Sequence, residues 1–148
     1  MIKVMFVCHG NICRSPMAEY LFKDMVNKLN LNNYFHIESR ATSTEEIGNP
    51  IYYKVEEIFD RLGIDTSNHQ ARQITRREYD LYDYIIVMDE YNLSNIKRMF
   101  NDNSKCKLLL SYLGINRSIS DPWYTRDFNL AYNEIKMGLE GFLKTFKF

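Results

Sequence analysis

The chain has 148 residues, of which 45% are apolar and 26% are charged, as is typical of soluble globular proteins, and this length predicts one domain over residues 1–148. Its 19 basic residues balance its 19 acidic residues, so bulk charge indicates neither a nucleic acid partner nor an anionic membrane surface. The three cysteines are too few for a disulfide framework, and the sequence has no zinc spacing, signal-peptide pattern or apolar run of about 20 residues. Together these absences predict a cytoplasmic protein.

Short apolar runs alternate with longer segments of helical periodicity in the first half of the chain. Ile2–Val7 predicts a strand that is buried on both faces, and apolar residues at helical spacing then cover Ala18–Leu29. Tyr34–Ser39 is a second, weaker strand candidate. Ile51–Leu62 has the spacing of another helix, and Gly63 stands at the position that commonly ends one.

The second half of the chain repeats this alternation. Tyr84–Met88 is the clearest strand candidate, Lys107–Leu110 is a shorter one, and the apolar stripe along Phe128–Phe146 predicts an amphipathic helix that faces the core. Strands separated by helices imply right-handed crossovers and a parallel sheet. The expected fold is therefore α/β, a single-domain doubly wound sheet of four parallel strands flanked by helices.

Residues at the carboxyl ends of these strands are the candidates for chemistry, because ligands of doubly wound folds bind there. They are Cys8 after the first strand, Ser39 after the second, Asp89 after the third, and the segment that leads to Asp121 after the fourth.

The loop after the first strand carries residues that suit phosphate binding. It reads Cys8-His9-Gly10-Asn11-Ile12-Cys13-Arg14. Pro16 fits the first helical position and makes Ser15 the expected N-cap, so the loop should end at a helix N-terminus with converging N–H donors. Gly10 and Asn11 tolerate positive φ, which would let the backbone curl around an anion.

Cys8 and Arg14 form the expected reactive pair. Arg14 follows Cys8 by six residues, and its planar fork could clamp two phosphate oxygens. The same positive field favours a thiolate at Cys8, which could attack phosphorus opposite the leaving group. The loop lacks the ending of a Walker A motif, and neither a metal nor a cofactor is expected.

A thiolate attack also needs a proton donor for the departing oxygen. Asp121 is the candidate, because it follows the last strand on the side where Cys8 should lie, beside the only tryptophan of the chain. The structural alternative is that Asp121-Pro122 opens a turn and that Trp123 and Tyr124 only pack this loop against the body.

The segment Val7–Glu19, which reads VCHGNICRSPMAE, resembles the signature of the low-molecular-weight protein tyrosine phosphatases. Further similar segments are Ala71–Thr75, Tyr84–Glu90 and Asp121–Tyr124, so the resemblance extends over the whole chain. It implies a protein tyrosine phosphatase that hydrolyses phosphotyrosine in a protein or peptide, and aryl phosphates, through a phosphocysteine intermediate.

The resemblance also implies the roles of individual residues. Cys8 would be the nucleophile, Arg14 and the loop N–H groups would bind phosphate, and Asp121 would act first as acid and then as base. The substrate-binding residues would be His9, Gly10, Asn11, Ile12, Cys13 and Ser15 of the loop, with Trp123 and Tyr124 as aromatic walls.

Supporting residues follow from the same resemblance. Asn11, Ser39 and His69 would form a hydrogen-bond network that holds the loop, and Ser15 would support the thiolate. Cys13 could form a reversible disulfide with Cys8 that protects it from over-oxidation.

Three positions depart from the family pattern. Arg40 stands where Gly is usual, Glu45 lies in a segment without the aromatic residue of the opposite rim, and His9 replaces an aliphatic or small residue. These changes are expected to alter the charge of the rim and the substrate preference while leaving the reaction intact.

Two other functions stay open at this point. An arsenate reductase shares the fold and loop but needs further cysteines, and only Cys106 lies outside the loop. A phosphoprotein-binding module would use the same cradle without turnover, although the combination of Cys8, Arg14 and Asp121 disfavours it. The oligomeric state stays open too.

Overall fold

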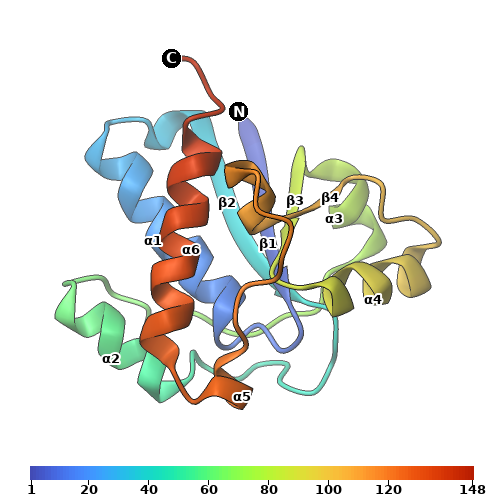
Figure 1. The fold of residues 1–148 in the computed structure, drawn as a ribbon, viewed down its shortest axis with the longest axis horizontal. Helices are drawn as coiled ribbons and strands as arrows, with labels where there is room; N and C mark the ends of the chain where they lie inside the picture. Colours follow the sequence, from blue (N-terminus) through green and yellow to red (C-terminus); the bar gives the residue numbers. More distant parts are fainter.

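The computed structural model describes residues 1–148 and contains one sheet of four parallel strands (Figure 1). The strands are β1 (Ile2–Cys8), β2 (Phe35–Ala41), β3 (Tyr84–Val87) and β4 (Cys106–Leu108), in the order β2-β1-β3-β4. Val4 of β1 pairs with Ile37 of β2 on one side and with Tyr84 of β3 on the other. The predicted α/β fold is therefore confirmed. Its crossovers diverge at the carboxyl end of β1, where doubly wound sheets bind their ligands.

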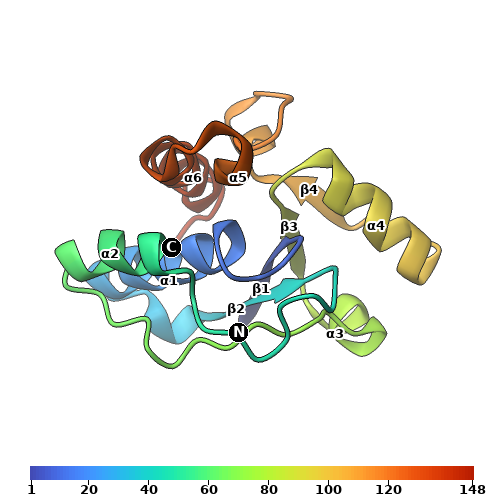
Figure 2. The ribbon, with the colours of Figure 1, turned by 90° about the horizontal axis from the view of Figure 1, so that it is seen from below.

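Helices cover both faces of this sheet (Figure 1, Figure 2). One side carries α1 (Arg14–Lys28), α2 (Tyr53–Arg61) and α6 (Phe128–Leu143), and the other carries α3 (Arg76–Leu81) and α4 (Glu90–Phe100). Three short helices complete the chain: η1 (Asn32–Tyr34), η2 (Leu109–Leu113) and α5 (Pro122–Thr125). None of these helices is both long enough and apolar enough to cross a membrane.

The central strand β1 is buried on both faces. Val4 and Phe6 belong to a cluster of 25 buried residues on the side of α1, α2 and α6, whereas Met5 and Val7 belong to a cluster of 10 on the side of α3 and α4. This division follows from the strand geometry, which points successive side chains to opposite faces. Each fully buried apolar side chain contributes about 1.5–3 kcal/mol to the stability of the fold. Burial of these side chains therefore holds β1 in place, and β1 ends at Cys8.

The start of α1 differs from the sequence prediction. The helix begins at Arg14 after Cys13, whose side chain makes no capping hydrogen bond. The predictions that Ser15 is the N-cap and that Pro16 occupies the first helical position were therefore wrong. The physical reason is a competing partner, because the Ser15 hydroxyl lies 3.0 Å from the Cys8 sulfur.

Other boundaries are displaced by a few residues. β2 continues to Ala41, so Ser39 lies inside the strand and not after it, and β4 ends at Leu108 where η2 begins. Gly63 has the positive φ of +72° expected after a helix. The sequence prediction contained neither α3 nor α4, although each begins with a capping box, Thr75 with Glu78 and Asp89 with Asn92, that could have indicated it.

Candidate active site

The loop between β1 and α1 wraps around the Cys8 sulfur. The Asn11 N–H donates to Sγ of Cys8 at 3.3 Å, and the Ser15 hydroxyl lies 3.0 Å from the same atom. Asn11 has a φ of +61°, which turns its N–H back toward the sulfur. Cys8 is buried at 4% exposure, so its sulfur is surrounded by donors and largely removed from water.

Gly10 serves this loop through its small size and not through its conformation. Its φ is not positive, so of the two loop residues that tolerate a left-handed conformation only Asn11 adopts it. A Cβ at this position would lie 3.3 Å from Cγ of Glu46. Glycine therefore allows the segment around Glu46 to approach the loop closely.

Arg14 connects the loop to the ends of two other strands. One of its amino groups donates to Oδ2 of Asp89 at 2.7 Å and lies 3.7 Å from Oδ2 of Asp121, while the other donates to the Ile119 carbonyl at 3.0 Å. Burial alone would lower the pKa of Arg14, but the negative charges of Cys8, Asp89 and Asp121 raise it above its ordinary value. The guanidinium is fixed in orientation and stays charged.

Sequence reasoning placed Asp89 at this edge of the sheet but did not assign it a partner, and it missed Ile119. Asp89 is also the N-cap of α4, where its other oxygen accepts from the Asn92 N–H at 2.9 Å. Asp89 therefore fixes Arg14 from a carboxylate that is itself fixed by a helix.

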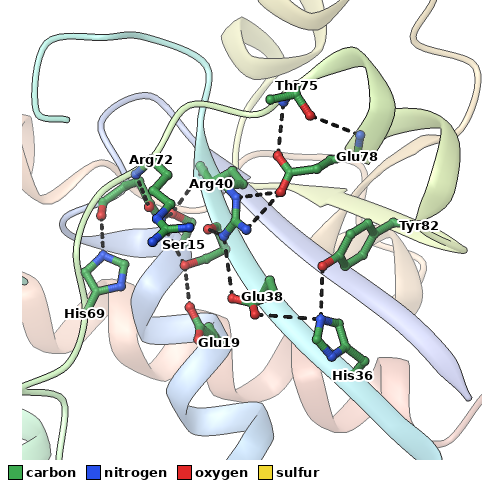
Figure 3. A network of polar contacts seen from close by, with 12 residues as sticks. Ser15, Glu19, His36, Glu38, Arg40, His69, Arg72, Thr75, Glu78 and Tyr82 are labelled. Atoms are coloured by element: carbon green, nitrogen blue, oxygen red, sulfur yellow. Dashed lines mark hydrogen bonds and ion pairs between the residues drawn. The ribbon is translucent and has the colours of Figure 1, made fainter. Parts of the chain in front are cut away.

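A buried network around Asn11 holds the left-handed turn of the loop, and Figure 3 labels three of the residues that take part in it, Ser15, His69 and Arg72. The Asn11 side-chain amide donates to Ser15 Oγ at 2.8 Å and to Ser39 Oγ at 2.9 Å, and its oxygen accepts from the Arg72 N–H at 3.1 Å. The Asn11 carbonyl lies 2.6 Å from Nε2 of His69. Asn11, Ser39 and His69, which were grouped by resemblance, thus lie together and are all buried.

Glu19 extends this network, and the sequence analysis did not identify it as a residue of the site. Its carboxylate accepts from the Ser39 hydroxyl at 2.6 Å and pairs with Lys23 on the next turn of α1. Because Ser39 donates to Glu19, its oxygen is free to accept from Asn11, and Ser15 likewise accepts from Asn11. The hydroxyl proton of Ser15 then has two acceptors within reach, the Cys8 sulfur at 3.0 Å and the Arg40 carbonyl at 3.4 Å, of which the sulfur is the nearer. A glutamate among the apolar positions of α1 was the signal that could have revealed it.

Asp121 faces the loop from the segment after β4. It is the N-cap of α5, and its Oδ1 accepts from the Trp123 N–H at 3.0 Å, which leaves Oδ2 near Arg14. The turn at Asp121-Pro122, which was the structural alternative, is therefore present, and Asp121 also lies beside Arg14 of the loop. These two features are compatible because they use different carboxylate oxygens.

Trp123 and Tyr124 follow Asp121 in α5 and have different surroundings. Trp123 is half exposed, with its ring centroid 4.6 Å from that of Tyr52 and 6.0 Å from that of Phe128. Tyr124 is 87% exposed. The sequence analysis did not identify Tyr52 as a residue of the site. Tyr52 contacts the loop directly, because its N–H donates to the Ile12 carbonyl at 2.9 Å.

The opposite rim carries a hydrogen-bonded pair of His9 and Glu45. Nε2 of His9 lies 3.1 Å from Oε2 of Glu45, and both side chains are more than half exposed. The backbone beneath them is tied by Ser43, whose N–H and hydroxyl both donate to the His9 carbonyl. These two departures from the family pattern therefore meet above the loop.

Arg40 does not belong to this rim, so the prediction that it alters the rim charge was wrong. Its side chain is 12% exposed and forms ion pairs with Glu78 at 2.9 Å and Glu38 at 3.5 Å (Figure 3). Neighbouring residues of a strand point to opposite faces. Ser39 therefore points toward α1 and the loop, and Arg40 points toward α3.

The remaining cysteines are buried thiols. Cys13 and Cys8 are both free, and burial, followed by the charge of Cys8, raises the pKa of Cys13. Burial raises the pKa of Cys106 to about 12, and Cys106 lies in the other apolar cluster. No group of three or more His, Cys, Asp or Glu side chains is arranged to hold a metal ion.

Fold and site together define a class of protein. The carboxyl end of a doubly wound parallel sheet carries a cysteine within a tight loop, an arginine fixed behind it and an aspartate opposite. This is the arrangement of an α/β protein that binds phosphate esters through a loop containing a reactive thiol.

Comparisons with known proteins identify the family. A family model described as "Low molecular weight phosphotyrosine protein phosphatase" matches residues 3–147. A protein of that name from Gallus gallus is 41% identical over 148 residues, which cover 95% of this chain and 93% of the relative. A Bacillus subtilis relative, "Low molecular weight protein-tyrosine-phosphatase YfkJ", is 40% identical over 97% of this chain and 94% of the relative. The chain belongs to the low molecular weight phosphotyrosine protein phosphatase family.

Solved structures agree with this assignment. The crystal structure of YfkJ from Bacillus subtilis has a TM-score of 0.93 and 38% identity, and covers 98% of this chain and 94% of that one. A structure titled "DARP, drosophila arginine phosphatase" has a TM-score of 0.89 and 32% identity, and covers 99% of each chain. Related folds of this family thus include a protein named for a different phosphorylated residue.

Proposed function

We propose that residues 1–148 act as one phosphotyrosine phosphatase domain, with Cys8 as nucleophile, Arg14 and the loop N–H groups as phosphate ligands and Asp121 as general acid and base. The observation that carries this proposal is the surroundings of the Cys8 sulfur. An N–H donor and a hydroxyl contact one buried thiol, and the Arg14 guanidinium, which Asp89 fixes, interacts electrostatically with Cys8. Such a field stabilises a thiolate and a phosphate dianion together.

In the first step the Cys8 thiolate attacks phosphorus while the bond from phosphorus to the phenolic oxygen breaks. Asp121 gives its proton to that oxygen, so tyrosine leaves as a neutral phenol. Arg14 and the loop N–H groups stabilise the charge on the equatorial oxygens. The products are a phosphocysteine at Cys8 and an Asp121 carboxylate.

In the second step the Asp121 carboxylate takes a proton from water as the water oxygen attacks phosphorus. The bond between sulfur and phosphorus breaks, and inorganic phosphate leaves. The Ser15 hydroxyl supports this step, because its proton is available to the departing Cys8 sulfur. Cys8 returns to the thiolate form and Asp121 to the acid.

An aromatic substrate suits the depth and the walls of the site. Cys8 is buried whereas Trp123, which contacts Tyr52, is half exposed, and a phenyl phosphate reaches farther from a peptide backbone than a seryl phosphate. Stacking between aromatic rings contributes about 0.5–1.5 kcal/mol beyond burial of area. The partner is a tyrosine-phosphorylated protein or peptide, and the free thiols suit the reducing environment of the cytoplasm.

The structural relative named an arginine phosphatase gives a second candidate substrate, phosphoarginine. The aromatic pair of Trp123 with Tyr52 near Asp121 favours a phenyl ring, because a guanidinium placed against it would lose hydrogen bonds to water. An electron relay for arsenate reduction is disfavoured, since Cys106 lies in the cluster on the other face of the sheet from Cys8.

The test compares phosphotyrosine, phosphoserine and phosphoarginine peptides at equal concentration, with and without EDTA. We expect phosphotyrosine to have the highest kcat/KM, unchanged activity in EDTA, and competitive inhibition by vanadate. A preference for phosphoarginine would overturn the substrate assignment. Binding of phosphotyrosine without any release of phosphate would instead indicate a binding module.

A further inference from the structure

The segment that carries Asp121 has no regular secondary structure of its own. It connects η2, which ends at Leu113, to α5, which begins at Pro122. Its position therefore depends on individual contacts with the body of the protein. The Ile119 N–H donates to the Met88 carbonyl at 2.8 Å, and the Ile119 carbonyl accepts from Arg14 at 3.0 Å. These two bonds fix Ile119 and leave the two residues that follow it to other partners.

Glu134 of α6 supplies the next contact. Its Oε1 accepts from the Ser120 N–H at 2.9 Å, and its Oε2 binds the Arg117 guanidinium. Ser120 directly precedes Asp121 in the sequence. Both oxygens of this one carboxylate are thus used by the segment that carries the proposed general acid.

A carboxylate at this position of α6 is unusual for the helix. Glu134 is 6% exposed, and the other buried positions of the helix are all apolar or glycine, including Ala131, Ile135 and Leu139. Burying a charge is costly unless it is paired and hydrogen-bonded. Burial alone would raise the pKa of Glu134, but the bonds from Ser120 and Arg117 outweigh this and lower it, so the group is held as a carboxylate.

We infer that Glu134 is a positioning residue for the reaction, holding Ser120 so that the adjacent Asp121 stays between Arg14 and the leaving group. This inference rests on the proposed function, because it assumes that Asp121 protonates that group. Glu134 itself touches neither substrate nor sulfur. It acts on the reaction through the backbone of the segment from Arg117 to Asp121.

The consequence is a specific kinetic defect in Glu134 variants. A misplacement of about 1 Å of a catalytic group can cost about a hundredfold in rate. The defect should appear where a proton is needed, with alkyl and unactivated phenyl phosphates, and should nearly vanish with p-nitrophenyl phosphate, whose leaving group departs without one. A general loss of folding would lower kcat/KM for all of these substrates alike.

The experiment measures kcat/KM over a series of aryl phosphates for the wild type, Glu134→Leu and Glu134→Gln. Glu134→Leu removes both acceptors, whereas Glu134→Gln retains an oxygen for the Ser120 N–H and should partly restore the activity. Glu140→Gln is the matched control, because Glu140 is an exposed glutamate of the same helix. We expect Glu134→Leu to lower kcat/KM by about tenfold or more for unactivated substrates and by less than about twofold for p-nitrophenyl phosphate.

Trp123 gives a second readout that does not need turnover. It is the only tryptophan of the chain and lies two residues after Asp121, in contact with Tyr52. Release of the segment should therefore increase acrylamide quenching of its fluorescence in Glu134→Leu, less in Glu134→Gln and not in Glu140→Gln.

The outcomes separate this inference from the proposed function. A wild-type protein that does not hydrolyse aryl phosphates would overturn the proposed function. The quenching series would still show whether Glu134 holds the segment that carries Asp121. An active wild type with the same leaving-group dependence and the same quenching in Glu134→Leu would overturn the role of Glu134.

Discussion

The two sides of the site differ in how firmly they are held. Cys8, Asn11, Cys13 and Arg14 of the loop are buried, and Asn11 alone contacts four other residues through its side chain and carbonyl. The rim is more exposed and is held by fewer contacts, such as the pair of His9 with Glu45 and the edge-to-face contact of Trp123 with Tyr52. Chemistry that requires fixed geometry is therefore placed in the buried interior, and substrate selection is left to side chains that can vary without disturbing it.

The largest effect should come from the centre of the loop. Cys8→Ser replaces the thiolate by a hydroxyl that stays protonated, and kcat should fall by about 10⁴-fold or more, as for other nucleophile deletions. Substrate binding should persist, because Arg14 and the loop N–H groups remain. Phosphate release and isothermal titration measure the two effects, with Cys106→Ser as control. Near-native turnover in Cys8→Ser would remove Cys8 from the nucleophile role.

Asp121→Asn tests the proposed general acid, which lies between the loop and the rim. Asparagine retains an oxygen for the Trp123 N–H but carries no proton to donate, so kcat/KM for phosphotyrosine should fall by about 10²–10⁴-fold. The loss should be smaller for p-nitrophenyl phosphate. Asp127→Asn is the control, because Asp127 is the N-cap of α6 in the same part of the chain. An equal loss with both substrates would contradict the acid role.

Asn11→Ala tests whether the network holds the loop. The change leaves the buried partners of Asn11 unpaired, and it leaves a non-glycine residue at positive φ without its supporting bonds. The free energy of unfolding should therefore fall by about 2–3 kcal/mol. Asn30→Ala is the matched control, since Asn30 has a φ of +59° but is exposed. Thermal denaturation measures both variants. Equal destabilisation would mean that backbone strain, and not the network, carries the effect.

The residues of the site that lie in one loop could be predicted from the sequence, whereas the residues that contact this loop from distant parts of the chain could not. Cys8, Asn11 and Arg14 lie in one loop whose strand and helix neighbours set its shape, and the alternation of apolar runs predicted the sheet. Glu19, Ile119 and Glu134 act through partners far along the chain, and no local pattern indicates which partner a buried carboxylate meets. Ser15 was misassigned because a capping preference is worth only about 1 kcal/mol, and Asn11 and the Cys8 sulfur occupy its hydroxyl instead.

Acid conditions should loosen the contact between Glu134 and the Asp121 segment. The ordinary pKa of 4.5 is lowered in the folded chain, so the unfolded chain binds the proton first as pH falls. The stabilisation is therefore complete above the unfolded value and is lost as pH falls through the folded value. The stability difference between wild type and Glu134→Gln, measured by urea denaturation, should shrink from pH 7 to about pH 3. A constant difference would contradict this assignment.

The smallest effect belongs to the rim. Exposed contacts between charged or polar side chains contribute at most about 1 kcal/mol, so Glu45→Gln should change kcat/KM for phosphotyrosine peptides by less than about fivefold. Activity should fall for peptides with Lys beside the phosphotyrosine and rise for those with Asp, because a negative charge of the rim is removed. Glu57→Gln on α2 is the control. A large loss with every peptide would place Glu45 in the chemistry of the site.

Direct detection of the covalent intermediate tests the central claim most directly. Wild-type protein is mixed with excess aryl phosphate, quenched in acid within milliseconds, digested and analysed by mass spectrometry. We expect one phosphoryl group on the peptide that contains Cys8, attached to its sulfur and absent from Cys8→Ser. Turnover without any phosphorylated peptide, or with the phosphoryl group on another residue, would contradict the phosphocysteine mechanism.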